Sequence, residues 1–267
     1  MTQDWGFPNP ATPAGSASYY ALRFAPRALR DALAACHGWR HLVRAVLDQV
    51  SDPRVAVAKL AWWREELQHC FECRPTHPLG LRLASVIERW GLPPKPFLDI
   101  AWSTDAVLSG HRPRDAAELG ACNTQDLGAL FELELRVQSG PDKQPDPAML
   151  GRARRLGAYV ARVEQIRDSG WLLRRGRTGF VPTEQARRAG LAPAELTQPV
   201  GLRHLPRLLA ELAGAAREAR APESTEGLPA SLRIRVALTE RLLDELEATG
   251  FDLADQRVSL SPIRKLW

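Results

Sequence analysis

The chain has 267 residues, 45% hydrophobic and 25% charged, which is enough to bury a substantial core in one large domain or two small ones. The formal charge of +5 gives poor support for a nucleic-acid partner, because the basic residues alternate with acids and are not interleaved with aromatics. No run approaches the roughly 18 apolar residues of a membrane span, and MTQDWGFPNPATPAG lacks the regions of a signal peptide. With four cysteines that show no disulfide spacing, these features predict a cytoplasmic protein with at most peripheral membrane contact.

Long segments rich in Ala, Leu, Arg and Glu, without alternating strands, predict an all-α fold. Residues 1–15 carry Pro and Gly and are expected to form an irregular N-terminal tail before a helical domain of residues 16–267. In chain order, helices are expected from Ser16–Tyr20 to near Pro26, over 28–50, from 53 through AKLAWWREELQHCF, and over 79–90, 96–108, 115–137, the first part of 156–182, 202–220 and 229–249. Residues 139–149 are the clearest loop, and 183–200 have a weaker pattern.

The helix expected over 28–50 carries a second, polar stripe at positions three and four apart: Arg30, His37, His41, Arg44 and Asp48. Because no glutamate lies between the two histidines in the zinc-protease pattern, they are interpreted as ordinary polar-face residues. The next helix has Asp52 as its expected N-cap and Pro53 at its first position. Its Trp62 and Trp63 are interpreted as anchors in the core.

Another candidate metal site is the pattern H-C-x2-C-x3-H, formed by His69, Cys70, Cys73 and His77, which has the residue types of soft zinc ligands. The cluster lies at a helix end without a second ligand pair. Buried cysteines with a surface histidine are therefore the favoured interpretation.

The stretch around which the chain is organised is LGAYVARVEQIRDSGWLLRRGRTGFVP, residues 156–182. One apolar stripe of its helix consists of Leu156, Tyr159, Val160, Val163 and Ile166. On another face, Glu164 and Asp168 lie one turn apart, so that their carboxylates can converge. Arginines follow, before the pattern breaks at Gly176. This arrangement suits a polyphosphate held partly through a metal ion; the alternative is a surface helix with a solvated charged face.

Near the N-terminus, the sequence SASYY has two interpretations. Ser16 and Ser18 precede or open a helix, where hydroxyl groups cap free backbone N–H groups. The same hydroxyls, with Tyr19, could instead donate hydrogen bonds to a phosphate. The cap is the favoured interpretation.

Taken together, these pieces resemble the squalene/phytoene synthase family, the head-to-head isoprenoid synthases. The segments that carry the resemblance are SASYYALRFAPRALRDALAA, SDPRVAVAKLAWWREEL, GLPPKPFLDI, QIRDSGWLLRRGRTGFVP and GFDLADQRVSLSPIRKLW. The resemblance implies a single all-α domain of the isoprenoid synthase fold, a helical bundle around a central cavity. In that fold two facing aspartate-rich motifs hold magnesium and diphosphate.

Both motifs are incomplete in this chain. The first, D-x-x-x-D, falls on Arg44 to Asp48, so its first aspartate is replaced by arginine. The second falls on Asp168 to Leu172, so its second aspartate is replaced by leucine. A guanidinium one turn from the remaining carboxylate repels Mg²⁺, and we expect Arg44 and Asp48 to pair with each other. Glu164, where the family usually has asparagine, could form a metal pair with Asp168.

These departures leave two hypotheses open. The first is a catalytically degenerate member that binds a prenyl-type lipid or diphosphate, or a protein partner, in an accessory role like that of the complex I assembly factors of this family. The second is an active Mg²⁺-dependent prenyltransferase that joins two farnesyl or geranylgeranyl diphosphates into a squalene- or phytoene-type product. No catalytic residue is assigned. The resemblance implies that Ser16, Ser18, Tyr19, Arg44, Arg167, Arg174 and Arg175 contact the diphosphate, with Asp48, Glu164 and Asp168 as metal ligands if the chain is active.

Overall fold

The computed structural model describes residues 4–50, 52–254, 258 and 260, and this part of the chain contains helices and no strands. The helices are α1 (Ala17–Arg23), η1 (Arg27–Leu29), α2 (Arg30–Gln49), α3 (Pro53–Phe71), α4 (Pro78–Trp90), α5 (Pro94–Leu108), α6 (Ala116–Asn123), η2 (Thr124–Gly128), α7 (Ala129–Ser139), α8 (Pro147–Arg167), α9 (Ser169–Leu173), α10 (Thr183–Arg188), η3 (Pro193–Thr197), α11 (Pro199–Arg220) and α12 (Ala230–Ala248). The expected all-α class is confirmed. The segment of weaker pattern contains two short helices and the start of α11.

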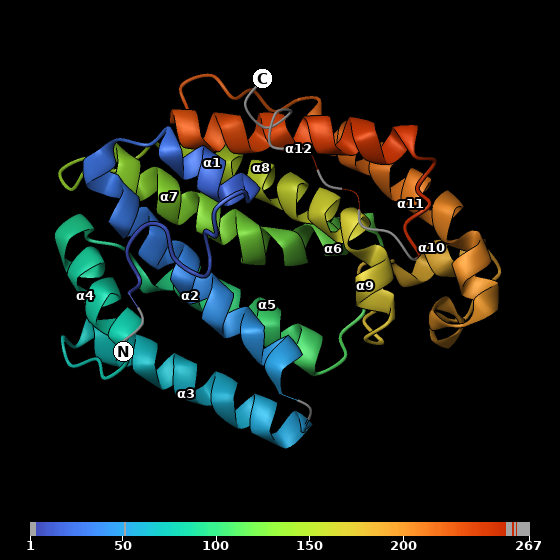
Figure 1. The fold of residues 1–267 in the computed structure, drawn as a ribbon, viewed down its shortest axis with the longest axis horizontal. Coiled ribbons are helices and arrows are strands. Elements are labelled where there is room, and N and C mark those ends of the chain that lie inside the picture. Colours follow the sequence, from blue (N-terminus) through green and yellow to red (C-terminus); the bar gives the residue numbers. More distant parts are fainter. Residues whose placement is uncertain (1–3, 51, 255–257, 259, 261–267) are drawn as a thin grey trace.

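The long helices pack in layers, with α3 at one edge and α12 at the opposite edge (Figure 1). Between them, α2 contacts α4, α5 and α7, while α8 contacts α7, α11 and α12. Buried apolar residues from all of these helices form one continuous core. The helices α2 and α8, which carry the two incomplete motifs, are thus central elements of the bundle.

The apolar stripe expected on α8 forms part of this core, since Leu156, Tyr159, Val160, Val163 and Ile166 are all buried. Burial of each such side chain contributes roughly 1.5–3 kcal/mol, which fixes the rotation of α8 about its axis. Glu164 then lies on the flank of this stripe, and Arg167 continues the stripe at the C-terminal end of α8. The start of α3 is also as expected, because the Asp52 carboxylate accepts a hydrogen bond from the Arg54 backbone N–H at 2.8 Å.

The helix expected over 115–137 is interrupted by the π-helical turn η2, Thr124–Gly128. The cause is a close approach of backbones between this turn and α8. A Cβ atom on Gly128 would lie 2.6 Å from the Arg154 carbonyl oxygen, and a Cβ atom on Gly157 would lie 2.6 Å from the Leu127 carbonyl oxygen. The contact needs glycine on both sides, and it brings Asp126 of η2 toward α2.

Residues 4–15 form no helix, but they pack on the core instead of projecting from it. Trp5 and Thr12 are fully buried, and the Asn9 side-chain amide donates hydrogen bonds to the carbonyl groups of Trp5 and Ala34 at 3.1 and 2.9 Å. This segment therefore covers the start of α2. The C-terminal sequence that contributes to the family resemblance lies mostly outside the described residues.

Candidate functional site

The two ends of the first motif do not pair with each other, contrary to expectation. The Arg44 guanidinium lies 3.2 Å from the Asp126 carboxylate, across the bundle on η2. Asp48 accepts a hydrogen bond from Arg177, and Arg175 lies 3.7 Å from the same carboxylate oxygen. Each residue of the motif is thus neutralised by a residue distant in sequence.

Asp126 is the counter-charge for two arginines of α2. Arg40 donates to both of its carboxylate oxygens, at 2.7 and 2.8 Å, and Arg44 adds the contact just described. Burial would raise the pKa of Asp126, but the attraction of Arg40 and Arg44 outweighs burial and holds the pKa below its ordinary value. Asp126 is therefore ionised at neutral pH. Its negative charge offsets the repulsion between the guanidinium groups of Arg40 and Arg44.

The second motif is also engaged by arginines. Arg167 donates to both oxygens of Asp168, at 2.9 and 2.6 Å, and its guanidinium lies 3.9 Å from Glu164. Glu164 also accepts a hydrogen bond from Arg235 of α12. Burial would raise the pKa of Glu164, yet the attraction of Arg235 and Arg167 keeps it below its ordinary value. The two carboxylates do converge as the spacing indicates, but they converge on Arg167.

Four residues of the predicted site surround one cavity of about 290 Å³ between α1, α8 and α12: Ser16, Ser18, Glu164 and Arg167. The expected helix cap is present, because the Ser16 hydroxyl accepts a hydrogen bond from the Tyr19 backbone N–H at 3.0 Å. The Tyr19 ring stacks on Phe7 at a centroid distance of 5.4 Å. The Ser16 oxygen is thus used by the helix.

The arginines after α8 have separate contacts. Arg174 donates a 2.6 Å hydrogen bond to the Ala254 carbonyl group. Arg175 lies over the Trp171 ring, 4.0 Å from its centroid, and Arg177 donates to the Leu47 carbonyl group at the end of α2. These contacts fasten the segment that begins at Arg174 to the end of α2, to α9 and to Ala254.

The polar stripe of α2 runs from the interior to the surface of the bundle: His37 is buried, Arg30, His41 and Arg44 are half-buried, and Asp48 is exposed, so the interpretation of His37 as an ordinary polar-face residue is wrong. His37 is 8% exposed, and its Nε2 atom lies 2.8 Å from a carboxylate oxygen of Glu134 on α7. These two residues, with Arg40 and Arg235, line a polar cavity of only about 80 Å³. The space between α2, α7 and α12 is therefore occupied largely by charged side chains.

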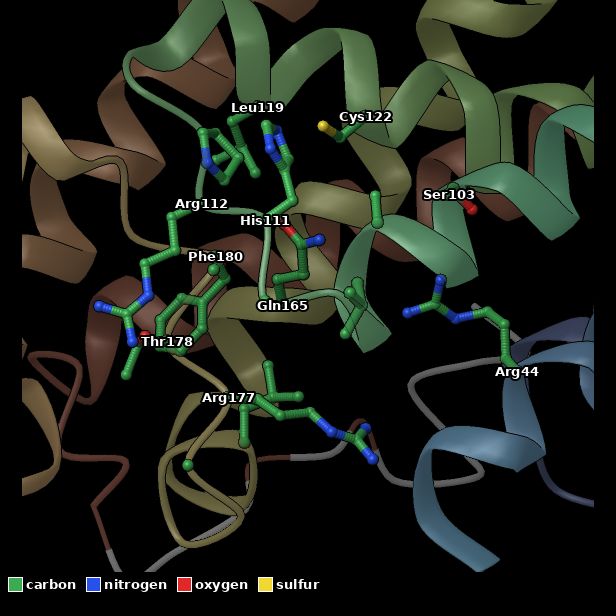
Figure 2. A pocket seen from close by; sticks show the side chains of 17 residues that line it. Arg44, Ser103, His111, Arg112, Leu119, Cys122, Gln165, Arg177, Thr178 and Phe180 are labelled. Carbon is green, nitrogen blue, oxygen red and sulfur yellow. The ribbon is translucent and has the colours of Figure 1, made fainter. Parts of the chain in front are cut away.

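A third pocket, of about 190 Å³, lies at the C-terminal ends of α2 and α8 (Figure 2). It is lined by Arg44 and by Leu172, the position of the missing second aspartate. Figure 2 shows Arg44 and Arg177 extending toward each other, with Arg112 on the opposite side. Gln165 also lines this pocket and exchanges amide hydrogen bonds with Asn123 at 2.8 and 3.3 Å.

Magnesium, which members of this fold typically use, does not fit the side chains present. Mg²⁺ requires near-octahedral oxygen ligands with free carboxylate lone pairs. Asp48 and Glu164 are each paired with arginine, and Asp168 is bonded by both arms of Arg167. The part of the chain that the structure describes has no group of three His, Cys, Asp or Glu residues arranged to hold a metal. A metal at these motifs would first require the arginines to leave.

The other candidates from the sequence also have structural roles. Cys70 is buried and Cys73 is exposed, while the His77 ring caps α4 by accepting a hydrogen bond from Leu79 at 3.1 Å. Trp63 is buried as expected, but the expectation is wrong for Trp62, which is 41% exposed.

The residues that sequence reasoning missed are the partners of the motif residues: Arg40, Asp126, Glu134, Arg177 and Arg235. Arg40 could have been found, since it lies one turn before Arg44 on the same helix face. Asp126 and Glu134 lie at either side of the apolar-rich run LGALFEL, which is a signal for a buried acid with a partner. Nothing local in the sequence identifies that partner, 86 residues away for Arg40 and Asp126.

The helical bundle and the position of its motifs define the isoprenoid synthase fold, and comparisons with known proteins agree. The squalene/phytoene synthase family model matches residues 11–264, so the chain belongs to the squalene/phytoene synthase family. Presqualene diphosphate synthase from Sinorhizobium fredii is 25% identical over 207 residues, which cover 76% of this chain and 71% of the relative.

Solved structures with the same fold include a dehydrosqualene synthase in complex with ligand. Its TM-score is 0.70 and its sequence identity is 20%, and the match covers 95% of this chain and 89% of the dehydrosqualene synthase. Squalene synthase HpnC from Alicyclobacillus acidocaldarius matches with a TM-score of 0.65 and 16% identity, over 90% of this chain and 92% of the HpnC chain. None of the helices in the described part of the chain is both long and apolar enough to cross a bilayer.

Proposed function

We propose that this chain is a catalytically degenerate member of its family, which performs little or no condensation and acts by binding a phosphorylated ligand in an accessory role. The observation that carries the proposal is the set of arginine partners at the motif carboxylates. Asp48 is held by Arg177, and Asp168 is held by Arg167. Family chemistry begins with metal-assisted loss of diphosphate, and carboxylates neutralised by guanidinium groups bind a hard cation poorly.

The interior of the bundle supports the same proposal. Head-to-head condensation needs room for two prenyl chains against apolar walls. Between α2 and α7 there is a cavity of only about 80 Å³ lined by Arg40, Glu134 and Arg235, and the cavity of about 290 Å³ between α1, α8 and α12 is also lined by charged residues, Glu164, Arg167 and Arg235. Placing a hydrocarbon chain among these charges would remove their polar contacts without replacing them, at a cost of several kcal/mol.

An active Mg²⁺-dependent prenyltransferase is the second candidate. It is favoured by the similarity to a relative named presqualene diphosphate synthase, and by the acids that remain at Asp48 and Asp168. On this hypothesis the substrate diphosphate would draw Arg167 and Arg177 away from the carboxylates and so free them for metal. A protein partner, as in an assembly factor, is compatible with the non-catalytic hypothesis.

The experiment that decides between these functions measures diphosphate release. Purified protein is incubated with Mg²⁺ and farnesyl or geranylgeranyl diphosphate. A Glu118→Gln variant, prepared in the same way, controls for contaminating activity in the preparation. The proposal expects release no faster than in the absence of protein. Mg²⁺-dependent release by the wild type that is lost in Asp168→Ala would establish the prenyltransferase instead.

A further inference from the structure

The pocket at the ends of α2 and α8 combines cations with apolar walls. Arg44, Arg112 and Arg177 line it, and none of the described residues that line it is acidic; Asp126 and Asp48, which pair with Arg44 and Arg177, are not among them. We propose that this pocket binds, without a metal ion, one phosphate or diphosphate ester whose apolar group has no more than about six carbon atoms. The inference rests on the proposed function, because it assigns a ligand class to the site of a non-catalytic chain.

Arg44 has unused capacity for an anion. Arg44 touches one oxygen of Asp126 at 3.2 Å, while Arg40 already donates to both oxygens of that carboxylate. A guanidinium has five N–H donors, so most of those of Arg44 remain for another acceptor. Burial lowers the pKa of Arg44, and repulsion from Arg40 and Arg177 adds to that shift. A bound anion would offset this repulsion.

Arg112 supplies a further cation on the opposite side of the pocket (Figure 2). Its side chain is exposed and makes no ion pair with any residue in the described part of the chain. Arginine binds both phosphate and carboxylate oxygens through paired N–H groups, but the higher negative charge of a phosphate suits three cations better than a carboxylate or chloride does. The pocket therefore selects for a phosphorylated compound.

The volume limits the rest of the ligand. A dry cavity of about 150 Å³ holds one benzene molecule, whereas sites for drug-sized ligands measure about 300–1,000 Å³. At about 190 Å³ this pocket accepts one small apolar group and excludes a pair of long prenyl chains. Its apolar walls include Leu119 and Phe180, which are 2% and 4% exposed and belong to the core. Such walls do not yield without disrupting packing.

Isothermal titration calorimetry in the presence of EDTA tests the proposal with inorganic pyrophosphate, isopentenyl diphosphate and farnesyl diphosphate as probes. Each buried methylene is worth roughly a fourfold change in Kd, so the five-carbon ester should bind at least about tenfold more tightly than pyrophosphate. Farnesyl diphosphate should bind no more tightly than the five-carbon ester. The proposal is overturned if no probe binds without Mg²⁺, or if affinity rises with the longer chain.

Paired variants locate the anion. Arg44→Gln should weaken binding of all bound probes by about tenfold, while Asp126 keeps both hydrogen bonds from Arg40. The exposed Arg112→Gln tests the opposite side without a risk to folding. Arg114→Gln is its matched control, since Arg114 lies on the same loop but pairs with Asp115. Equal losses in the Arg112 and Arg114 variants would mean non-specific attraction and would overturn the proposal.

A third variant tests the apolar part of the pocket. Val107 lines the pocket and is 39% exposed, so Val107→Trp can fill the space without disturbing the core. Pyrophosphate should bind this variant as it binds the wild type, but the advantage of isopentenyl diphosphate should disappear. If isopentenyl diphosphate still binds this variant more tightly than pyrophosphate does, its apolar group lies outside this pocket and the proposal is overturned. Failure of these binding results would remove the phosphorylated ligand but would leave the absence of condensation intact, because only diphosphate release contradicts that absence.

Discussion

Removal of the Asp126 carboxylate is the sharpest test of how the fold tolerates Arg44. In Asp126→Asn, Arg40 and Arg44 lose the only carboxylate that pairs with either of them among the described residues. Breaking a buried ion pair from one side costs about 3–5 kcal/mol. The side chains of Arg40 and Arg44 are 24% and 28% exposed, which allows partial solvation and places the expected loss near about 3 kcal/mol.

Urea denaturation measures this loss. At an m-value of about 3 kcal/mol per molar, the midpoint should fall by about 1 M. The control is Asp244→Asn, which removes a carboxylate paired with Arg217 at 2.7 Å but 58% exposed. That exposed pair should be worth less than about 1 kcal/mol. If the two variants lose the same stability, Asp126 is not the internal counter-charge that we describe.

The pH dependence has a defined sign. The pKa of Asp126 is lower in the folded protein than the ordinary value of 3.8, so its contribution to stability is present above that value and is lost as the pH falls below it. The difference in unfolding free energy between wild type and Asp126→Asn should thus stay constant from pH 7 to about pH 5 and shrink only below the ordinary value. A difference that grows on acidification would contradict the assignment.

Three further predictions concern the scaffold. In the native protein, N-ethylmaleimide should modify the exposed Cys73 well before Cys70, because burial raises the pKa of Cys70 to about 12. Peptide mass spectrometry over time measures the order of modification, and equal rates would contradict the prediction. Gly157→Ala should destabilise the protein by about 1–3 kcal/mol. Gly214→Ala, whose new Cβ atom would meet nothing within 4 Å, should instead stabilise it by about 0.5–1 kcal/mol. If the urea midpoints of the two variants move in the same direction, the close contact at η2 is refuted. Glu66→Gln should cost about 1–3 kcal/mol in the same assay, because the buried carboxylate accepts three hydrogen bonds from the loop before α4, and an unchanged midpoint would mean that the loop is held elsewhere.

The fold could be predicted because its signals are local and repeated. Apolar spacing marks α8, and a proline with an acidic cap marks the start of α3. The order of five segments then indicates the family. The interruption of the 115–137 helix could not be predicted, because it depends on contact between Gly128 and Gly157, which are not neighbours in the sequence. Helical propensity favours a continuous helix there.

The candidate site was predicted only in part, for a related reason. The sequence identifies Arg44, Asp48, Glu164 and Asp168 as the residues at the motif positions, and the structure brings Glu164 and Asp168 to one arginine. The expected Arg44–Asp48 pair relied on helical spacing, which fixes proximity along one helix but not competition from other helices. Asp126, bonded twice by Arg40, attracts Arg44 toward the interior, and this competition is visible only in three dimensions.

We infer that arginines have taken over the role of metal ions at both motifs. A crystal structure of the protein grown with Mg²⁺ and inorganic pyrophosphate tests it most directly. We expect pyrophosphate to be bound against Arg44 and Arg177, with Asp168 still bonded to Arg167 and no metal ion between them. Magnesium ions coordinated by Asp48 and Asp168, with both arginine partners displaced, would contradict it.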